Sequence, residues 1–154
     1  MLRRTLLAML LAASAGCATK PASAVYGSFV PQAPPSDSKY MANDVVAKLV
    51  AMYPPARTRI SLRHATPDGF GASLVGALRT KGYALSEFKT GPSAGAAARP
   101  SLAAGDLALA YVVDQPRDTG LYRVTVLING QSLSRVYLAK DGTMKSAGSW
   151  VRKE

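Results

Sequence analysis

The chain contains one histidine, His64, which is the first residue to consider for acid–base chemistry. A histidine that acts as a general base needs a carboxylate to orient it and a nucleophile within reach. Asp68 follows four residues later, and Ser61 and Ser73 lie nearby in the sequence. These residues lack the spacing of a nucleophile elbow, and the chain has no Walker-type or dinucleotide-binding glycine pattern. We therefore expect a protein that is not an enzyme and has no catalytic residues.

The composition also limits metal and redox chemistry. The chain has 154 residues with a single Cys and a single His, which excludes a disulfide framework and a conventional multi-Cys/His metal site. Apolar residues make up 48% of the chain, so disorder throughout is excluded, and the length fits one domain. We expect no metal and no dissociable cofactor.

The only cysteine has a specific setting near the N-terminus. Arg3 and Arg4 precede an apolar run from Thr5 to Ala15, which has the length of a signal-peptide core and is too short to span a bilayer. The run ends in Ser14-Ala15-Gly16-Cys17. This string resembles the lipobox of bacterial lipoproteins, although Leu is usual at the position of Ser14.

The lipobox resemblance implies that residues 1–16 are a lipoprotein signal peptide and that Cys17 carries a covalent lipid, with acyl chains such as palmitate. Ala18 rather than Asp follows the cysteine, which by resemblance to sorted lipoproteins favours the outer membrane. We therefore expect a lipoprotein anchored in the cell outer membrane and facing the periplasm. The alternative is an ordinary secretory peptide cut at Ala13-Ser14-Ala15 or at Ala22-Ser23-Ala24, which leaves a soluble protein with a free thiol.

The chain is basic, with 19 Lys and Arg against nine Asp and Glu. Cleavage of the signal removes two basic residues and no acidic one, which lowers the formal net charge from +10 to +8. An exported basic protein can meet nucleic acid, anionic headgroups or an acidic partner. The basic residues are scattered, no run of five like charges occurs, and aromatics do not alternate with them. We expect a solvated basic surface and no nucleic-acid binding.

Residues 17–38 are rich in Ala, Ser and Pro, and Pro31-Gln32-Ala33-Pro34-Pro35 favours extended backbone. The sequence therefore predicts a lipidated Cys followed by an extended tether. Tyr26, Phe29 and Val30 stand out within it as apolar residues. They are either plain linker residues or a short partner-binding segment that docks extended on another protein.

Hydrophobic periodicity and turn residues divide the rest of the chain. The expected elements are a helix at 39–53 capped by Ser38, a strand at 57–63, a helix opened by Thr66-Pro67-Asp68 and stopped at Lys81-Gly82, and strands at 83–89, 106–114, 120–129 and 131–140. A flexible Ala/Gly-rich loop is expected at 90–105, and a short segment around Trp150 ends the chain. Residues 39–154 then form a single small α+β domain, with two helices packed on an antiparallel sheet of about four to five strands.

The Asn129-Gly130 pair is the clearest turn signal, because a type I′ hairpin turn needs positive φ at both residues. A hairpin centred there pairs Val126 with Leu133, Val124 with Arg135, and Tyr122 with Tyr137. One face of the hairpin is then mostly apolar, as expected of a sheet that packs under helices.

Several strings, taken in order, resemble the TrbH family of conjugal transfer proteins. They are Tyr26-Gly27-Ser28-Phe29-Val30, Leu49-Val50-Ala51-Met52-Tyr53-Pro54-Pro55-Ala56, Ala65-Thr66-Pro67-Asp68-Gly69-Phe70-Gly71, Leu78-Arg79-Thr80-Lys81-Gly82-Tyr83-Ala84-Leu85, Gln131-Ser132-Leu133-Ser134-Arg135-Val136-Tyr137 and Gly148-Ser149-Trp150-Val151-Arg152-Lys153. None is a catalytic motif. The resemblance runs from the lipobox almost to the C-terminus.

The resemblance implies a structural lipoprotein of a plasmid-transfer apparatus, the mating-pair-formation type IV secretion system. It implies contact with the channel subunits of the outer-membrane core complex, with multiple copies in a ring. The only residue role that it carries over is lipidation of Cys17. The alternative function is a free-standing outer-membrane lipoprotein that binds an anionic envelope polymer through its basic surface.

Overall fold

The computed structural model describes residues 26–30, 33–88, 102–117 and 119–153. These residues form β1 (Gly27–Ser28), α1 (Pro35–Met52), a 3₁₀ turn (Pro55–Arg57), β2 (Arg59–Leu62), α2 (Gly69–Thr80), β3 (Ala84–Ser86), β4 (Leu107–Asp114), β5 (Leu121–Ile128), β6 (Gln131–Lys140), β7 (Thr143–Ser146) and β8 (Val151–Lys153). The expected signal peptide, Cys17, and positions 90–101 of the expected loop lie outside the described residues.

The sheet is mixed and has eight strands in the order β3-β2-β4-β5-β6-β7, with β1 beside β4 and β8 beside β6. The α+β class is confirmed, whereas the expectation of four to five antiparallel strands is wrong. β4, β5 and β6 form the expected antiparallel strands and β7 extends them, but β2 pairs in parallel with β3 and β4, and β1 pairs in parallel with β4. Parallel pairs join segments that are distant in sequence, so they leave no turn signal to read.

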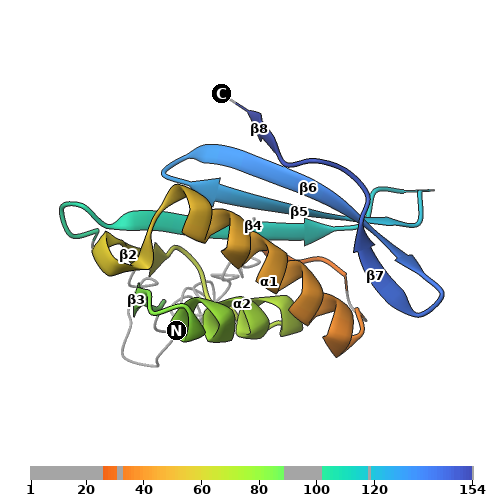
Figure 1. Cartoon of the computed structure of the whole chain (residues 1–154), viewed down its shortest axis with the longest axis horizontal. Helices are drawn as coiled ribbons and strands as arrows, with labels where there is room; N and C mark the ends of the chain where they lie inside the picture. Colours follow the sequence, from red (N-terminus) through yellow and green to blue (C-terminus); the bar gives the residue numbers. More distant parts are fainter. Residues whose placement is uncertain (1–25, 31–32, 89–101, 118, 154) are drawn as a thin grey trace, which may run out of the picture.

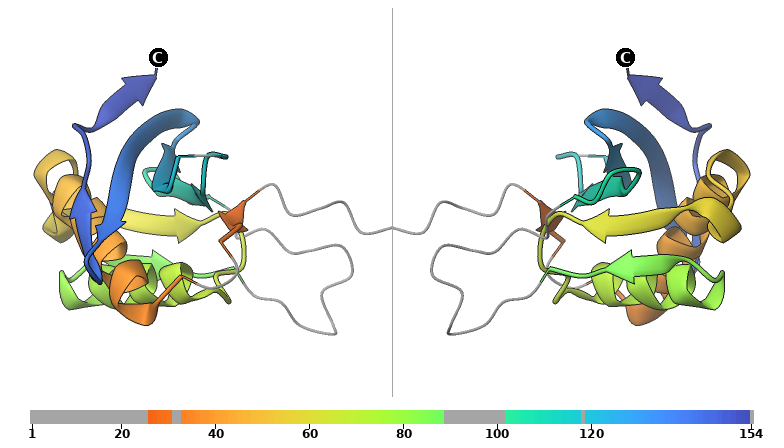
Figure 2. Two further views of the ribbon diagram at one scale, coloured as in Figure 1. Left: turned by 90° about the vertical axis from the view of Figure 1, so that its right-hand side faces the viewer. Right: turned by 90° about the vertical axis from the view of Figure 1, so that its left-hand side faces the viewer.

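Both helices cover the same face of the sheet, which gives a two-layer architecture (Figure 1). The sheet is strongly twisted, and β7 comes down beside α1 at one end (Figure 2). The core lies between the layers. Its largest fully buried side chains are Tyr111, Tyr137, Phe70, Met41, Leu49, Ile60, Leu62, Leu74, Leu78 and Leu109.

α1 begins at Pro35, four residues before the expected start. Proline suits the first helical position, because its fixed φ fits the helix and its missing N–H would have no helical partner there. Ser38 is therefore a buried first-turn residue and not the cap. The helix ends at Met52, and Tyr53 is extended, as the residue before a proline prefers to be.

α2 is capped at both ends by local chemistry. The Asp68 side chain accepts a hydrogen bond from the Gly71 backbone N–H at 2.8 Å, so Asp68 is the N-cap and the helix starts at Gly69. At the other end Gly82 has φ +84° and donates to the Arg79 carbonyl, while the Tyr83 N–H donates to the Leu78 carbonyl. These two bonds form a Schellman motif, which confirms the expected glycine stop.

The β5–β6 hairpin forms in the predicted register. Val126 lies opposite Leu133, Val124 opposite Arg135, and Tyr122 opposite Tyr137. The turn residues Asn129 and Gly130 have φ of 50° and 86°, as a type I′ turn requires.

The carboxylate of Asp44 joins α1 to β6. Arg135 Nη1 lies 3.0 and 2.9 Å from the two Asp44 oxygens, and the Tyr137 hydroxyl donates to Asp44 Oδ2 at 2.7 Å. Burial, and then the hydrogen bond to Asp44, raise the pKa of Tyr137 well above its ordinary value, so this hydroxyl stays protonated. The guanidinium also lies 5.8 Å from the ring centroid of Trp150, which holds the C-terminal segment near β6.

α2 approaches β4 closely at Gly71. A Cβ at this position would collide with the Tyr111 hydroxyl and would lie 2.8 Å from Thr66 Cβ. Tyr111 is fully buried and its hydroxyl is hydrogen-bonded, so it has little freedom to move aside. Gly71 therefore sets the distance between helix and sheet.

We predict that Gly71→Ala lowers the free energy of unfolding by about 1–3 kcal/mol, the usual cost of overpacking a core. Gly76→Ala is the matched control in the same helix, because a Cβ there meets nothing within 4 Å. It should raise stability by about 0.5–1 kcal/mol through helix propensity. Urea unfolding of both variants checks the pair, and equal effects would contradict the close approach.

Candidate partner-binding site at the N-terminal segment

The segment that holds Tyr26, Phe29 and Val30 lies on the folded domain at the edge of the sheet. Gly27 pairs with Val112 and Ser28 with Val113, and the Phe29 N–H donates to the Val113 carbonyl at 2.7 Å. Gly27 has φ +124°, a conformation that side chains rarely allow. Residues 26–30, which the sequence placed in the tether, thus lie along the edge of the sheet, with Gly27 and Ser28 as a short edge strand.

The three predicted partner-binding residues lie in different environments. Val30 packs against the hydrophobic core, and Tyr26 is half-buried over His64. Phe29 is 53% exposed. Of the three, Phe29 is the one whose large apolar side chain is free for a partner.

Aromatic rings join this segment to the core. Tyr26 stacks on His64 with centroids 5.5 Å apart, His64 meets the edge of Tyr111 at 4.5 Å, and Phe70 meets Tyr111 at 4.9 Å. The four residues are the residue before β1, one in the loop after β2, one on β4 and one on α2. Sequence analysis missed this cluster, because its members are far apart in the chain and follow no motif.

His64 has both ring nitrogens engaged. Nδ1 lies 2.8 Å from the Ala65 carbonyl, and the Tyr111 backbone N–H donates to Nε2 at 3.2 Å. Because Nε2 accepts and a carbonyl can only accept, the ring is neutral with its proton on Nδ1. Burial lowers the pKa of His64, an effect partly opposed by the Ala65 carbonyl and by the charge of Asp68.

Both carboxylate oxygens of Asp68 also accept hydrogen bonds. Its Oδ1 accepts from the Gly71 N–H, and its Oδ2 accepts from the Tyr111 hydroxyl at 2.6 Å. Burial and this hydrogen bond raise the pKa of Tyr111 well above its ordinary value. The Asp68 oxygens therefore hold α2 and β4 together.

The two serines that the sequence placed near His64 do not join it. The Ser73 hydroxyl donates to the Gly69 carbonyl at 2.8 Å. Ser61 Oγ is fully buried and has no hydrogen-bond partner in the described residues. Ser61, His64, Asp68 and Ser73 thus form no hydrogen-bonded catalytic triad.

Two further features of the described ranges concern metals and membranes. No group of three or more His, Cys, Asp or Glu side chains there is placed to hold a metal ion. No helix within these ranges is long and apolar enough to cross a bilayer.

The fold and this site define a small two-layer α+β module whose N-terminal segment enters as an edge strand of its sheet. The sequence model of the conjugal transfer protein TrbH family matches residues 23–154. The chain therefore belongs to the TrbH family of conjugal transfer proteins, and the expected resemblance is confirmed. No curated protein and no solved structure matches the chain.

The environments of Tyr26 and Phe29 predict different effects for the same substitution. Tyr26→Ser removes the stacked ring over His64 and should lower the free energy of unfolding by about 1 kcal/mol. Phe29→Ser removes an exposed side chain and should change it by less than about 0.5 kcal/mol. Chemical denaturation of the two variants measures the difference. Equal destabilisation would mean that Phe29 belongs to the core in solution.

The buried neutral His64 predicts a pH dependence of stability. Its pKa is lower in the folded state than the unfolded value of about 6.5, so the unfolded chain binds more protons as the pH falls through this value. The contribution of His64 to the free energy of unfolding should therefore be complete above about pH 6.5 and be lost as the pH falls below this value. His64→Gln, which cannot titrate, should flatten the profile between about pH 5 and pH 7.

The chain offers a direct check, because His64 is its only histidine. The single histidine ring signal in an NMR titration should show a midpoint below about 6.5. A midpoint at or above that value would contradict a neutral ring that accepts from Tyr111.

Proposed function

We propose that this protein is a lipid-anchored structural component of a conjugative type IV secretion apparatus. In this proposal Cys17 carries the anchor in the outer membrane, and the domain faces the periplasm, where it contacts the channel core in several copies. The observation that carries the proposal is membership of a conjugal transfer family over residues 23–154, directly after a lipobox-like sequence.

The structure supports a positioning role. The segment after the expected anchor, Tyr26 to Val30, is held by hydrogen bonds to β4 and by the ring stack on His64. With an anchor at Cys17, this segment would connect the anchor to β4, an inner strand of the sheet. The ring nitrogens of His64 and the carboxylate oxygens of Asp68 are engaged in hydrogen bonds within the domain, which supports a structural and non-enzymatic role.

The two candidate functions differ in what must accompany the protein. A core-complex component is recovered with channel subunits, whereas a free-standing lipoprotein that binds an anionic polymer is recovered without them. Affinity purification from detergent-solubilised outer membranes, followed by mass spectrometry, separates the two. Stoichiometric channel subunits support the proposal, and the lipidated protein alone contradicts it.

The anchor gives the sharpest genetic test. Cys17→Ala removes the thiol that would be lipidated, so the variant should remain unprocessed or soluble, and plasmid transfer should fall sharply. Labelling with radioactive palmitate, membrane fractionation and mating efficiency measure the three effects. Ser14→Leu is the matched control, because it brings the lipobox to the usual pattern and should leave all three readouts at or above the wild-type level. Unchanged fractionation of Cys17→Ala would remove the lipoprotein claim.

A further inference from the structure

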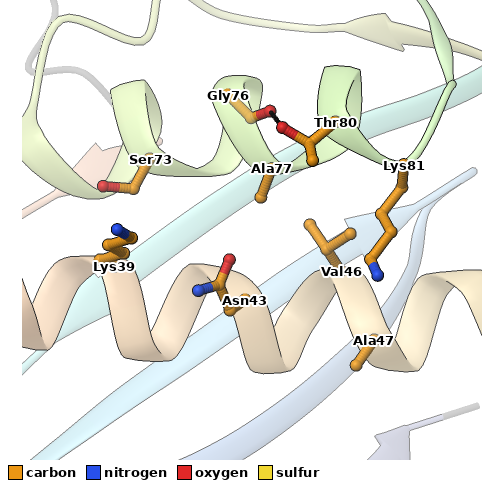
Figure 3. Close-up of a pocket in the computed structure, with 9 residues that line it drawn as sticks. All are labelled: Lys39, Asn43, Val46, Ala47, Ser73, Gly76, Ala77, Thr80 and Lys81. Carbon is orange, nitrogen blue, oxygen red and sulfur yellow. Dashed lines mark hydrogen bonds between the residues drawn. The ribbon is translucent and has the colours of Figure 1, made fainter.

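The outer surface of the helical layer has a groove between α1 and α2 (Figure 3). The two helices run side by side in the same direction there, and the hollow has a volume of about 630 Å³. The residues that line it are Lys39, Asn43, Val46, Ala47, Ser73, Gly76, Ala77, Thr80 and Lys81.

The α2 wall of the groove lets another backbone approach closely. Ser73, Gly76, Ala77 and Thr80 follow one face of the helix and are all small. Gly76 is exposed in the middle of a helix, where glycine costs about 0.5–1 kcal/mol relative to alanine. The fold does not require it, because an added Cβ would meet nothing within 4 Å. Its small size leaves open space on the outer surface of the helix.

The polar groups of this wall are already satisfied. The hydroxyls of Ser73 and Thr80 donate to carbonyls one turn earlier, at 2.8 and 2.9 Å, so they present their carbon atoms to the groove. Val46 and Ala77 lie deeper between the helices. The floor of the groove is thus mostly apolar.

The ends of the groove are cationic. Lys39 lies at one end and Lys81 at the other (Figure 3), and neither forms an ion pair with any described residue. Most carboxylates in the described ranges are occupied elsewhere: Asp37, Asp44, Asp68, Glu87, Asp106 and Asp114 each have a hydrogen bond or an ion pair. The groove therefore keeps two free ammonium groups that an external acidic group can reach.

We propose that this groove binds an α-helix of a partner protein, one that presents small apolar residues to the groove floor and a carboxylate to each lysine. The groove is lined by residues 39 to 47 of α1 and 73 to 81 of α2. Each stretch is about 12 Å long at 1.5 Å per residue, so the two lysines at opposite ends are separated by about this distance along the groove. Two carboxylates seven residues apart on one helix face are separated by about 10.5 Å along the axis, and the flexible lysine side chains can cover the difference. A second copy of this chain fits less well, because its own groove presents like charges.

The test uses synthetic peptides and the full-length lipoprotein purified in detergent. The probe is a fluorescent alanine-rich helical peptide with two glutamates seven residues apart, which lie on one face. A second peptide of the same composition has its glutamates five residues apart, so they lie on different faces. Fluorescence anisotropy should show saturable binding of the first peptide and at least about tenfold weaker binding of the second.

Variants of the protein locate the binding. Gly76→Leu fills the groove, and Lys39→Glu with Lys81→Glu reverses its charge, so each should weaken binding by about tenfold or more. Lys140→Glu with Lys145→Glu makes the same charge change on β6 and β7, at residues that do not line the groove, and should stay within about twofold of wild type. Circular dichroism confirms folding, and Ala47→Leu, at an exposed lining position, replaces Gly76→Leu if that variant unfolds.

The proposal is overturned if the peptide fails to saturate below about 1 mM, or if filling the groove leaves its affinity unchanged. It is also overturned if the control pair of charge reversals weakens binding as much as the groove pair, since the attraction is then a general effect of net charge. The measurement contains no secretion subunits. Its result therefore tests the groove and does not depend on whether the proposed function is correct.

Discussion

The carboxylate of Asp68 is the constraint on which the arrangement of the domain depends. One oxygen caps α2 through the Gly71 N–H, and the other accepts from the Tyr111 hydroxyl on β4. Both bonds are made by one planar carboxylate. The distance between the first turn of α2 and β4 is therefore fixed by the geometry of that group. Gly71 has no Cβ to occupy that space. The Tyr111 N–H also donates to His64, so the same strand position fixes the ring on which Tyr26 stacks.

The distribution of charge follows from a similar use of carboxylates. Asp68 and Asp44 each accept a hydrogen bond from the hydroxyl of a buried tyrosine on the sheet. Asp68 thereby joins the N-cap of α2 to β4, and Asp44 joins α1 to β6. Other acidic side chains pair with arginines on neighbouring strands or loops, as Asp114 does with Arg123. Hydrogen bonds and ion pairs within the domain thus occupy most of the acidic residues in the described ranges, while the described lysines are exposed or half-exposed. The basic character of this protein is a property of its outer surface, where it is available to partners.

Local signals in the sequence predicted local structure well. The Asn129-Gly130 turn gave the β5–β6 register residue by residue, and Lys81-Gly82 gave the end of α2, because backbone conformation there depends on adjacent residues. The parallel pairing of β1 and β2 with β4 was not predictable, since it depends on contacts between distant segments. For the same reason Tyr26 and Val30 were interpreted as tether residues. Their partners, His64 and the core, are visible only in the fold.

The position of β1 changes the geometry of the proposed anchor. A tether that ran from Cys17 to Ser38 would reach about 70–75 Å when fully extended, whereas Tyr26 is only nine positions after Cys17, which allows a reach of about 30 Å. The edge of the sheet at β1 would then stay close to the bilayer. In the proposed arrangement a short tether would therefore hold the domain near the membrane, with the edge of the sheet at β1 as the part nearest to the anchor.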